Sequence, residues 1–78
     1  MYHRIEFIGR LGKEPELKTL QSGDVCELSV ATDIYKNSEK QTVWFRVMVW
    51  GAMAKVAAQS LHKGNMVFVE GKQIPYFL

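Results

Sequence analysis

The sequence predicts an all-β domain in which a single short helix plugs a small rolled sheet. Apolar and polar residues alternate along most of the chain, as they do in half-buried strands. Only residues 52–62 space their apolar side chains as a helix does. The 78 residues contain no repeat, linker or low-complexity tract, so we expect a single domain over residues 1–78.

The first half of the chain is predicted to contribute two strands separated by a loop. The first strand covers 2–11, where apolar and polar residues alternate except at Ile8, which breaks the polar set and indicates that both sides of the strand are covered there. Residues 12–23 contain Pro15 and a Ser-Gly pair, which predict a loop and turn, with Leu17 pointing inward. The second strand covers 25–32, and its core face carries Cys26, Leu28 and Val30.

The second half is predicted to form a strand, the helix and a last strand. Residues 35–41 are polar and predict a mobile hairpin tip. Residues 42–50 give the strongest strand signal, because β-branched and aromatic residues fill them without Gly or Pro. The helix is expected over 52–62, with Gly64 as its left-handed cap, and a strand over 67–71. The apolar face of the helix comprises Met53, Val56, Ala57 and Leu61.

Composition excludes several classes of protein. The first apolar residues alternate with Arg4 and Glu6, unlike a secretory signal, and no apolar run is long enough to cross a bilayer. We therefore expect a cytoplasmic protein with no membrane partner. The formal charge of +2 permits nucleic-acid binding without demanding it. Cys26 is the single cysteine, so it forms no internal disulfide; we interpret it as a buried, inert thiol, with catalysis or metal binding as the alternatives.

Catalysis has little support in the sequence. Glu14 and Glu16 flank a proline in a predicted loop, and nothing marks them as a matched acid and base. His3 and His62 are far apart and lack the spacing of a zinc site. No nucleophile triad or phosphate-binding loop is visible. We expect neither an enzyme nor a cofactor, and no small-molecule substrate.

The outward face of residues 42–50 is unusual. A solvated sheet face is normally polar, yet this one carries Trp44, Arg46, Met48 and Trp50. Three explanations compete: burial by another subunit or by the rest of the barrel, a stacking platform for nucleobases, or a groove for a sugar or protein ligand. Aromatic rings stack on any base, and a neighbouring Arg pairs with phosphate or adds a cation–π contact.

Basic residues elsewhere fit a nucleic-acid interpretation to different degrees. For a lone lysine, such as Lys18 or Lys63, solvation alone is the simpler explanation. Arg4 and Arg46 are better candidates, because each shares a strand face with an aromatic residue. Arg10 lies on the same face of its strand as Arg4.

The chain resembles the bacterial single-stranded DNA-binding protein family. The resemblance begins at Ile8-Gly9-Arg10-Leu11-Gly12-Lys13-Glu14-Pro15-Glu16-Leu17, is clearest at Gln41-Thr42-Val43-Trp44-Phe45-Arg46-Val47 and Trp50-Gly51, and extends to Val69-Glu70-Gly71. It implies an oligonucleotide/oligosaccharide-binding (OB) fold, a partly open Greek-key barrel that we expect here with its fifth strand missing or replaced. It also implies single-stranded DNA and a second copy of the chain as partners, a homotetramer ahead of a dimer, and a nucleoid-associated role in DNA replication, repair and recombination.

The resemblance also assigns roles to individual positions. The DNA-binding residues that the resemblance implies are Trp44, Trp50, Tyr35, Arg4, Arg46 and Lys63, and the pattern of basic residues adds Arg10 and Lys18 as candidates. The first strand of the family pairs across a dimer axis, and the aromatic tail here can cover the open barrel, replace a lost DNA contact or form an interface. The oligomer-interface residues that the resemblance implies are Tyr2, His3, Ile5 and Phe7, and Tyr76 and Phe77 of the tail are added as our own candidates.

Departures from the family define the alternative function. The hairpin before Thr42 is short, Thr19 stands where an aromatic is common, and residues 72–78 differ from the family's closing hairpin and acidic tail. The leading hypothesis is sequence-independent binding of single-stranded DNA by base stacking and phosphate pairing. The alternative is a truncated OB-fold oligomerisation module, or a primosome-type adaptor, with weak DNA binding.

Overall fold

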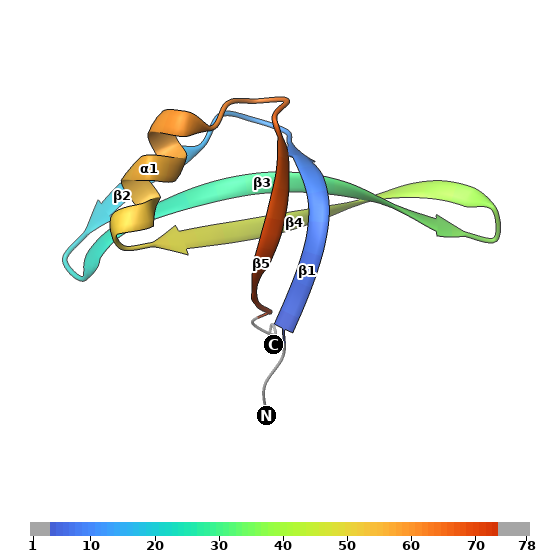
Figure 1. Ribbon diagram of the computed structural model, residues 1–78, viewed down its shortest axis with the longest axis horizontal. Coiled ribbons are helices and arrows are strands. Elements are labelled where there is room, and N and C mark those ends of the chain that lie inside the picture. Colours follow the sequence, from blue (N-terminus) through green and yellow to red (C-terminus); the bar gives the residue numbers. More distant parts are fainter. Residues whose placement is uncertain (1–3, 74–78) are drawn as a thin grey trace.

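The computed structural model describes residues 4–73, which form five strands and one helix (Figure 1). The sheet consists of β1 (Arg4–Leu11), β2 (Glu16–Leu20), β3 (Gly23–Lys36), β4 (Glu39–Trp50) and β5 (Met66–Lys72), with α1 (Ala52–Ser60) between the last two strands. The predicted all-β class with one short helix is confirmed. None of the described residues lies in a helix with the length and apolarity needed to span a membrane.

The central strand is β3, which bonds to three others. On one edge, β3 pairs with β4 along the whole hairpin, from Val25 opposite Trp50 to Lys36 opposite Glu39. On the other edge it pairs first with β2 and then with the end of β1, where Leu11 lies opposite Val30. The β1–β5 ribbon crosses the hairpin (Figure 1). All of these pairings are antiparallel.

The sheet is open among the described residues. Within residues 4–73, strand β4 pairs only with β3, and β5 pairs only with β1. The rolled sheet therefore has the unclosed form that the sequence predicted, although it contains five strands where four were expected, three before the helix and one after it.

That additional strand, β2, corrects the loop predicted over residues 12–23. Residues Glu16–Leu20 pair with Gly23–Glu27 directly after Pro15. Leu17, predicted to point inward, keeps 42% of its surface exposed because β2 pairs with β3 on one edge only and lies at the margin of the sheet. The sequence did not predict this strand, because its five residues are mostly polar and have no buried face. Backbone pairing with β3 defines the strand instead.

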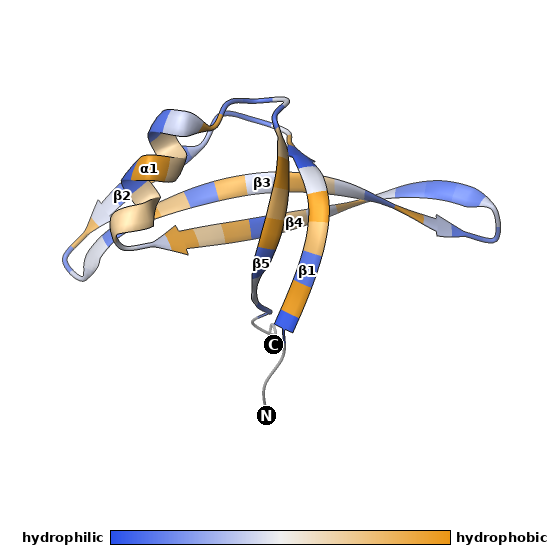
Figure 2. Cartoon of the chain, viewed as in Figure 1, coloured by the Kyte–Doolittle hydropathy of each residue, from blue (hydrophilic) through white to orange (hydrophobic). Residues whose placement is uncertain are grey.

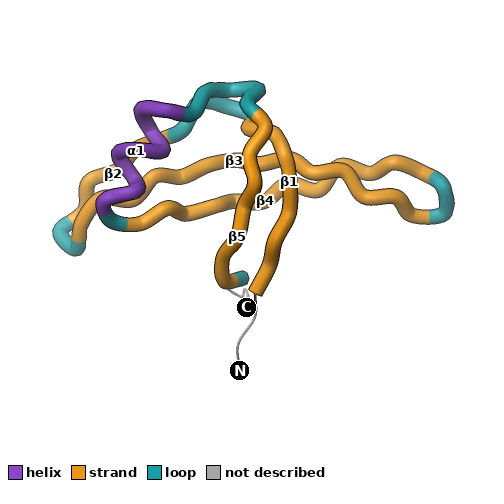
Figure 3. The backbone as a smooth tube through the Cα atoms, viewed as in Figure 1, coloured by secondary structure: helices purple, strands orange, loops and turns teal. Residues whose placement is uncertain are grey.

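The β3–β4 hairpin is paired almost to its end, where the sequence predicted a mobile tip. The polar segment 35–41 continues the ladder, leaving a two-residue loop, Asn37 and Ser38 (Figure 3). Both residues have positive φ, 54° and 66°, which matches the twist of antiparallel strands in a tight hairpin. Hydrophilic residues dominate this end of the hairpin, so its strand character comes from backbone pairing (Figure 2).

The core lies between the helix and the inner faces of β1, β3 and β4. Its buried members are Leu11, Cys26, Leu28, Val30, Ala54 and Ala57. Burial also raises the pKa of the Cys26 thiol, which disfavours the reactive thiolate. The rings of Phe7 and Phe45 stack 4.4 Å apart where β1 crosses the hairpin.

The helix turns only part of its predicted face to the core. Ala57 is buried and Leu61 packs against the core, as predicted, but Met53 and Val56 remain 60% and 48% exposed. Ala54, which was not predicted, is also buried, and the small side chains of the two alanines let α1 approach β3 closely. The helix ends at Ser60, and Gly64 (φ +91°) serves the turn that follows, in which the Asn65 backbone N–H bonds to the His62 carbonyl.

Candidate nucleic-acid interface

Strand β4 separates its side chains into a core face and an open face. Val47 and Val49 pack against the core. On the other side, Trp44 and Trp50 keep 60% and 57% of their surface exposed. We call the outward set of Trp44, Arg46, Met48 and Trp50 the stacking face. Two indoles exposed to this extent on one strand offer flat surfaces for a planar ligand.

The ring of Trp44 lies against the backbone just after β1. A Cβ placed on Gly12 would be 2.4 Å from the edge of that ring, so only a residue without a side chain leaves room for it. The Gly12 N–H donates to the Ser29 carbonyl oxygen at 2.9 Å, which holds this backbone in place. Gly12 therefore sets the position of the Trp44 ring.

Strand β3 lies beneath the stacking face with small or buried residues. Ala31 lies opposite Trp44, and Val25, which is 1% exposed, lies opposite Trp50. Val25 also pairs with Lys18 of β2, so it is enclosed between that lysine and the indole of the neighbouring strands. The residues of β3 opposite the two indoles, Ala31 and Val25, are therefore small or buried.

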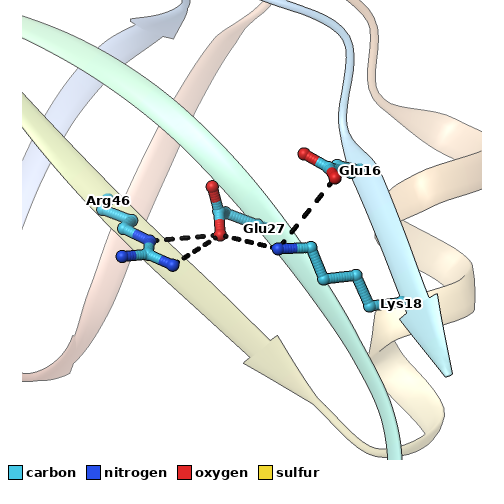
Figure 4. A network of polar contacts seen from close by, with 4 residues as sticks. All are labelled: Glu16, Lys18, Glu27 and Arg46. Carbon is cyan, nitrogen blue, oxygen red and sulfur yellow. Dashed lines mark hydrogen bonds and ion pairs between the residues drawn. The ribbon is translucent and has the colours of Figure 1, made fainter. Parts of the chain in front are cut away.

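Arg46 and Lys18 meet at one carboxylate between the two indoles. Oε1 of Glu27 accepts hydrogen bonds from Nε of Arg46 at 3.1 Å and from Nζ of Lys18 at 3.4 Å (Figure 4). Lys18 also lies 4.0 Å from a carboxylate oxygen of Glu16. The bond from Arg46 is the main reason that the pKa of Glu27 is lowered, so the carboxylate stays charged at neutral pH.

Tyr35 shares this side of the hairpin but lies farther out. It pairs with Lys40, and Lys40 lies on the same side of β4 as Trp44 because side chains of a strand alternate. Four residues along a strand correspond to about 14 Å. Tyr35 is 75% exposed, so it presents a third ring along the hairpin, separated from the two indoles.

A shallow groove of about 300 Å³ borders the stacking face where β1 crosses the hairpin. Arg10 lines it from β1, and its Nη1 donates to the carbonyl of Gly64 at 3.2 Å. The full lining is Ile8, Gly9, Arg10, Ala31, Thr32, Asp33, Thr42 and Met66. The sequence pattern did not indicate this groove, because residues of four strands, β1, β3, β4 and β5, form it.

One predicted basic residue, Arg4, lies away from this region, at the start of β1, where it forms ion pairs with Glu6 and Glu70. Lys63 is in the loop after α1, where its backbone N–H donates to the Glu14 carboxylate and its neighbour Gly64 accepts the bond from Arg10. The structure thus brings together Trp44, Trp50, Arg46 and Lys18, adds Arg10 and Tyr35 at the margins with Lys63 in the loop bonded to Arg10, and leaves Arg4 apart.

The predicted oligomer interface is only partly visible. Tyr2, His3, Tyr76 and Phe77 lie outside the described residues. The Phe7 ring faces inward against Phe45, and Ile5 is half-buried.

The outer face of the β1–β5 ribbon carries apolar residues that the sequence pattern did not single out. Ile8, Met66 and Phe68 are 58%, 60% and 62% exposed, and Ile8 pairs directly with Phe68. The break in polar alternation at Ile8 was the one signal in the sequence that pointed to this patch.

Comparison with known proteins places this geometry in a family. Residues 2–73 match the Single-strand binding protein family. The single-stranded DNA-binding protein 1 of Xylella fastidiosa (strain 9a5c) is 36% identical over 76 residues, which cover 88% of this chain and 56% of that protein. The single-stranded DNA-binding protein of Neisseria meningitidis serogroup A is 34% identical over 76 residues, covering 90% of this chain and 44% of that one. This chain spans about half the length of these curated relatives.

A solved structure gives the same fold. The crystal structure of the small single-stranded DNA-binding protein from Streptomyces coelicolor is similar with a TM-score of 0.81, at 23% identity, over 92% of this chain and 74% of that one. This similarity supports the predicted OB-fold. From the match over residues 2–73 and the identity to its relatives, the chain belongs to the Single-strand binding protein family.

Proposed function

We propose that this chain binds single-stranded DNA without sequence preference, by stacking bases on Trp44 and Trp50 and pairing phosphates with Arg46. The observation that carries the proposal is the stacking face, where two indoles more than half exposed flank a guanidinium on one strand. The names of its relatives support the same activity. Tyr35, Arg10 and Lys18 extend the surface available to the strand, while Arg4 and Lys63 would act at its periphery.

The energetics fit such a surface. Stacking of a base on an aromatic side chain contributes about 1–3 kcal/mol and does not depend on which base is present. Pairing of phosphates with basic side chains displaces condensed counterions, so affinity should fall steeply as salt concentration rises. The formal charge of only +2 makes the local placement of cations more important than the overall field.

Titration with an oligothymidine, monitored by tryptophan fluorescence, tests the proposal. We expect quenching at low salt that is reversed by added salt. Trp44→Ala and Trp50→Ala should each weaken binding by about 5- to 150-fold, corresponding to the loss of about 1–3 kcal/mol, and each leaves one indole as the reporter. Met53→Ala removes an equally exposed apolar side chain from the helix and should bind as the wild type does. A folded wild-type protein without quenching would contradict the proposal.

We further propose that the chain acts as a homo-oligomer, a tetramer ahead of a dimer, at the bacterial nucleoid in replication, repair or recombination. Strand pairing of residues 4–9 in the described part of the chain is with β5 alone, so β1 has a second edge on which another copy can add. The exposed apolar patch of Ile8, Met66 and Phe68 supports the same partner.

That patch also favours the second candidate, an oligomerisation or primosome-type adaptor module with weak DNA binding. The two candidates differ in what the indoles do. In the DNA-binding protein, Trp44→Ala and Trp50→Ala lose affinity and remain assembled. In the adaptor, the same variants lose their assembly, which sedimentation at micromolar concentration would detect.

A further inference from the structure

Glu27 is an unusual residue for a surface that meets a polyanion. Its side chain is 11% exposed, compared with 64% for Arg46 and 41% for Lys18. It projects from β3 into the middle of the stacking face, where the register sets it opposite Met48. A fixed negative charge therefore lies beneath the two cations best placed to meet a DNA backbone.

One oxygen of this carboxylate holds both cations. Oε1 lies 3.0 Å from Nη2 and 3.1 Å from Nε of Arg46, and 3.4 Å from Nζ of Lys18 (Figure 4). The Nε–Nη2 edge is one of the edges through which a guanidinium pairs with a phosphate. A phosphate that takes this edge must separate Arg46 from Glu27.

The geometry also determines which partner moves. Glu27 is enclosed by β2 and β4, so it cannot follow the cations outward. Arg46 and Lys18 have long side chains that already reach solvent. With Glu16 included, the two cations and two carboxylates of this cluster carry no net formal charge, so the free protein presents little local attraction to phosphate.

We propose that Glu27 is an internal competitor of the DNA phosphates: it binds Arg46 and Lys18 when DNA is absent and releases them when a strand docks. The inference rests on the proposed single-stranded DNA binding and deepens it, because it names the residue that limits affinity at that site. The same exchange favours dissociation of the DNA, because Arg46 and Lys18 can pair with the Glu27 carboxylate again when the phosphates leave.

Paired charge-neutralising variants test the inference. Glu27→Gln keeps the shape of the side chain and frees both cations. Glu16→Gln changes the net charge equally on the same cluster, but Glu16 reaches only Lys18, at 4.0 Å. In oligothymidine titrations at low salt, we expect Glu27→Gln to bind about 3- to 10-fold more tightly than wild type and Glu16→Gln to differ by less than about 2-fold. The slope of log affinity against log salt should stay close to the wild-type slope, because Arg46 and Lys18 pair with phosphates in both complexes.

The outcomes separate this inference from the proposed function. If the wild type does not bind at all, the proposed function fails. If the wild type binds but Glu27→Gln binds no better than Glu16→Gln, only the competitor role fails, and the effect is one of net charge. Weaker binding by Glu27→Gln would also overturn it, because Glu27 would then be holding Arg46 in its DNA-binding position.

A measurement on the wild-type protein gives an independent answer even if Glu27→Gln does not fold. Carbon NMR can follow the carboxyl groups of Glu27 and Glu16 from pH 6 to pH 3, with and without oligothymidine, whose bases do not titrate in this range. If the strand withdraws Arg46 and Lys18, the pKa of Glu27 should rise in the complex. An unchanged pKa of Glu27 in the bound protein would overturn the inference.

Discussion

At the scale of single residues, Gly9 and Gly12 approach their neighbours equally closely but meet different kinds of atom. A Cβ on Gly9 would lie 2.5 Å from the Ala31 carbonyl oxygen and 2.6 Å from a methyl of Val30. A Cβ on Gly12 would lie 2.4 Å from the exposed Trp44 ring. The backbone of β3 cannot yield without disturbing the sheet, whereas a half-exposed ring can rotate outward.

We therefore expect the two alanine variants to behave differently. Gly9→Ala should lower the free energy of unfolding by about 1–3 kcal/mol through overpacking. Gly12→Ala should lower it by less than about 1 kcal/mol but displace the Trp44 ring, shifting tryptophan emission and weakening oligothymidine binding. Urea unfolding and fluorescence titration measure both effects. Equal destabilisation by the two substitutions would show that Trp44 is fixed more firmly than its exposure indicates.

The sequence predicted the position of a side chain correctly where the pattern of a single strand determines that position. Period-two alternation placed Trp44, Arg46 and Trp50 on one face, and the structure has them there. The ion pairs of Glu27 could not be predicted from the sequence, because its partners Lys18 and Arg46 come from two other strands. The alternating pattern alone predicts that a glutamate in such a strand faces solvent. Only the register of β2, β3 and β4 shows which cations lie beside it.

At the scale of elements, a carboxylate joins the loop after β1 to the loop after α1. Oε1 of Glu14 lies 3.2 Å from Nδ1 of His62, and the other oxygen accepts the backbone N–H of Lys63. The same loops exchange backbone bonds, from Gly64 N–H to the Leu11 carbonyl and from Leu11 N–H to the Asn65 carbonyl. The backbone bond from Lys63, followed by the contact with His62, holds the pKa of Glu14 below its ordinary value of 4.5.

This contact predicts a loss of stability in acid. Because the pKa of Glu14 is lowered in the folded state, its contribution is present above about pH 4.5 and is lost as pH falls through the folded-state value. Glu27 acts in the same direction. Urea unfolding between pH 7 and pH 3 should show a decline that Glu14→Gln makes shallower, with lower stability than wild type at pH 7. Glu39→Gln at the hairpin turn serves as the control and should retain the full decline.

Element boundaries were predictable where side chains define them and not where backbone pairing does. The strands β1, β3, β4 and β5 and the helix were located from apolar periodicity to within a few residues at most ends. Strand β2 and the outer hairpin are polar and exist through their ladders to a neighbour. In the helix, apolar residues lie on two overlapping faces. Close packing on β3 buries Ala54 and Ala57 and leaves Met53 and Val56 exposed.

At the scale of the whole molecule, the open sheet leaves two surfaces of different character. The stacking face combines indoles with paired charges, and the outer face of the β1–β5 ribbon combines an apolar centre with ion pairs of Arg4 to Glu6 and Glu70 at one end. In the described part of the chain, residues 4–9 of β1 pair with β5 alone, and the edge that they leave adjoins the second surface. An exposed apolar patch beside an unpaired strand edge is the usual setting of an interface between chains. The two surfaces meet at the groove that Ile8 and Met66 line beside Arg10, so the proposed assembly surface borders the proposed DNA-binding surface.

Substitutions on the apolar patch should separate assembly from folding. Ile8→Glu and Phe68→Glu place charge on side chains that are already more than half exposed in the single chain, so the fold should survive while association is lost. Sedimentation at micromolar concentration should show the wild type as an oligomer and both variants as smaller species with unchanged circular dichroism. Val56→Glu, at an exposed position on the helix, is the matched control and should sediment as the wild type does. A wild type that sediments as a monomer would contradict the proposed assembly, and variants that remain assembled would place the interface elsewhere than on this patch.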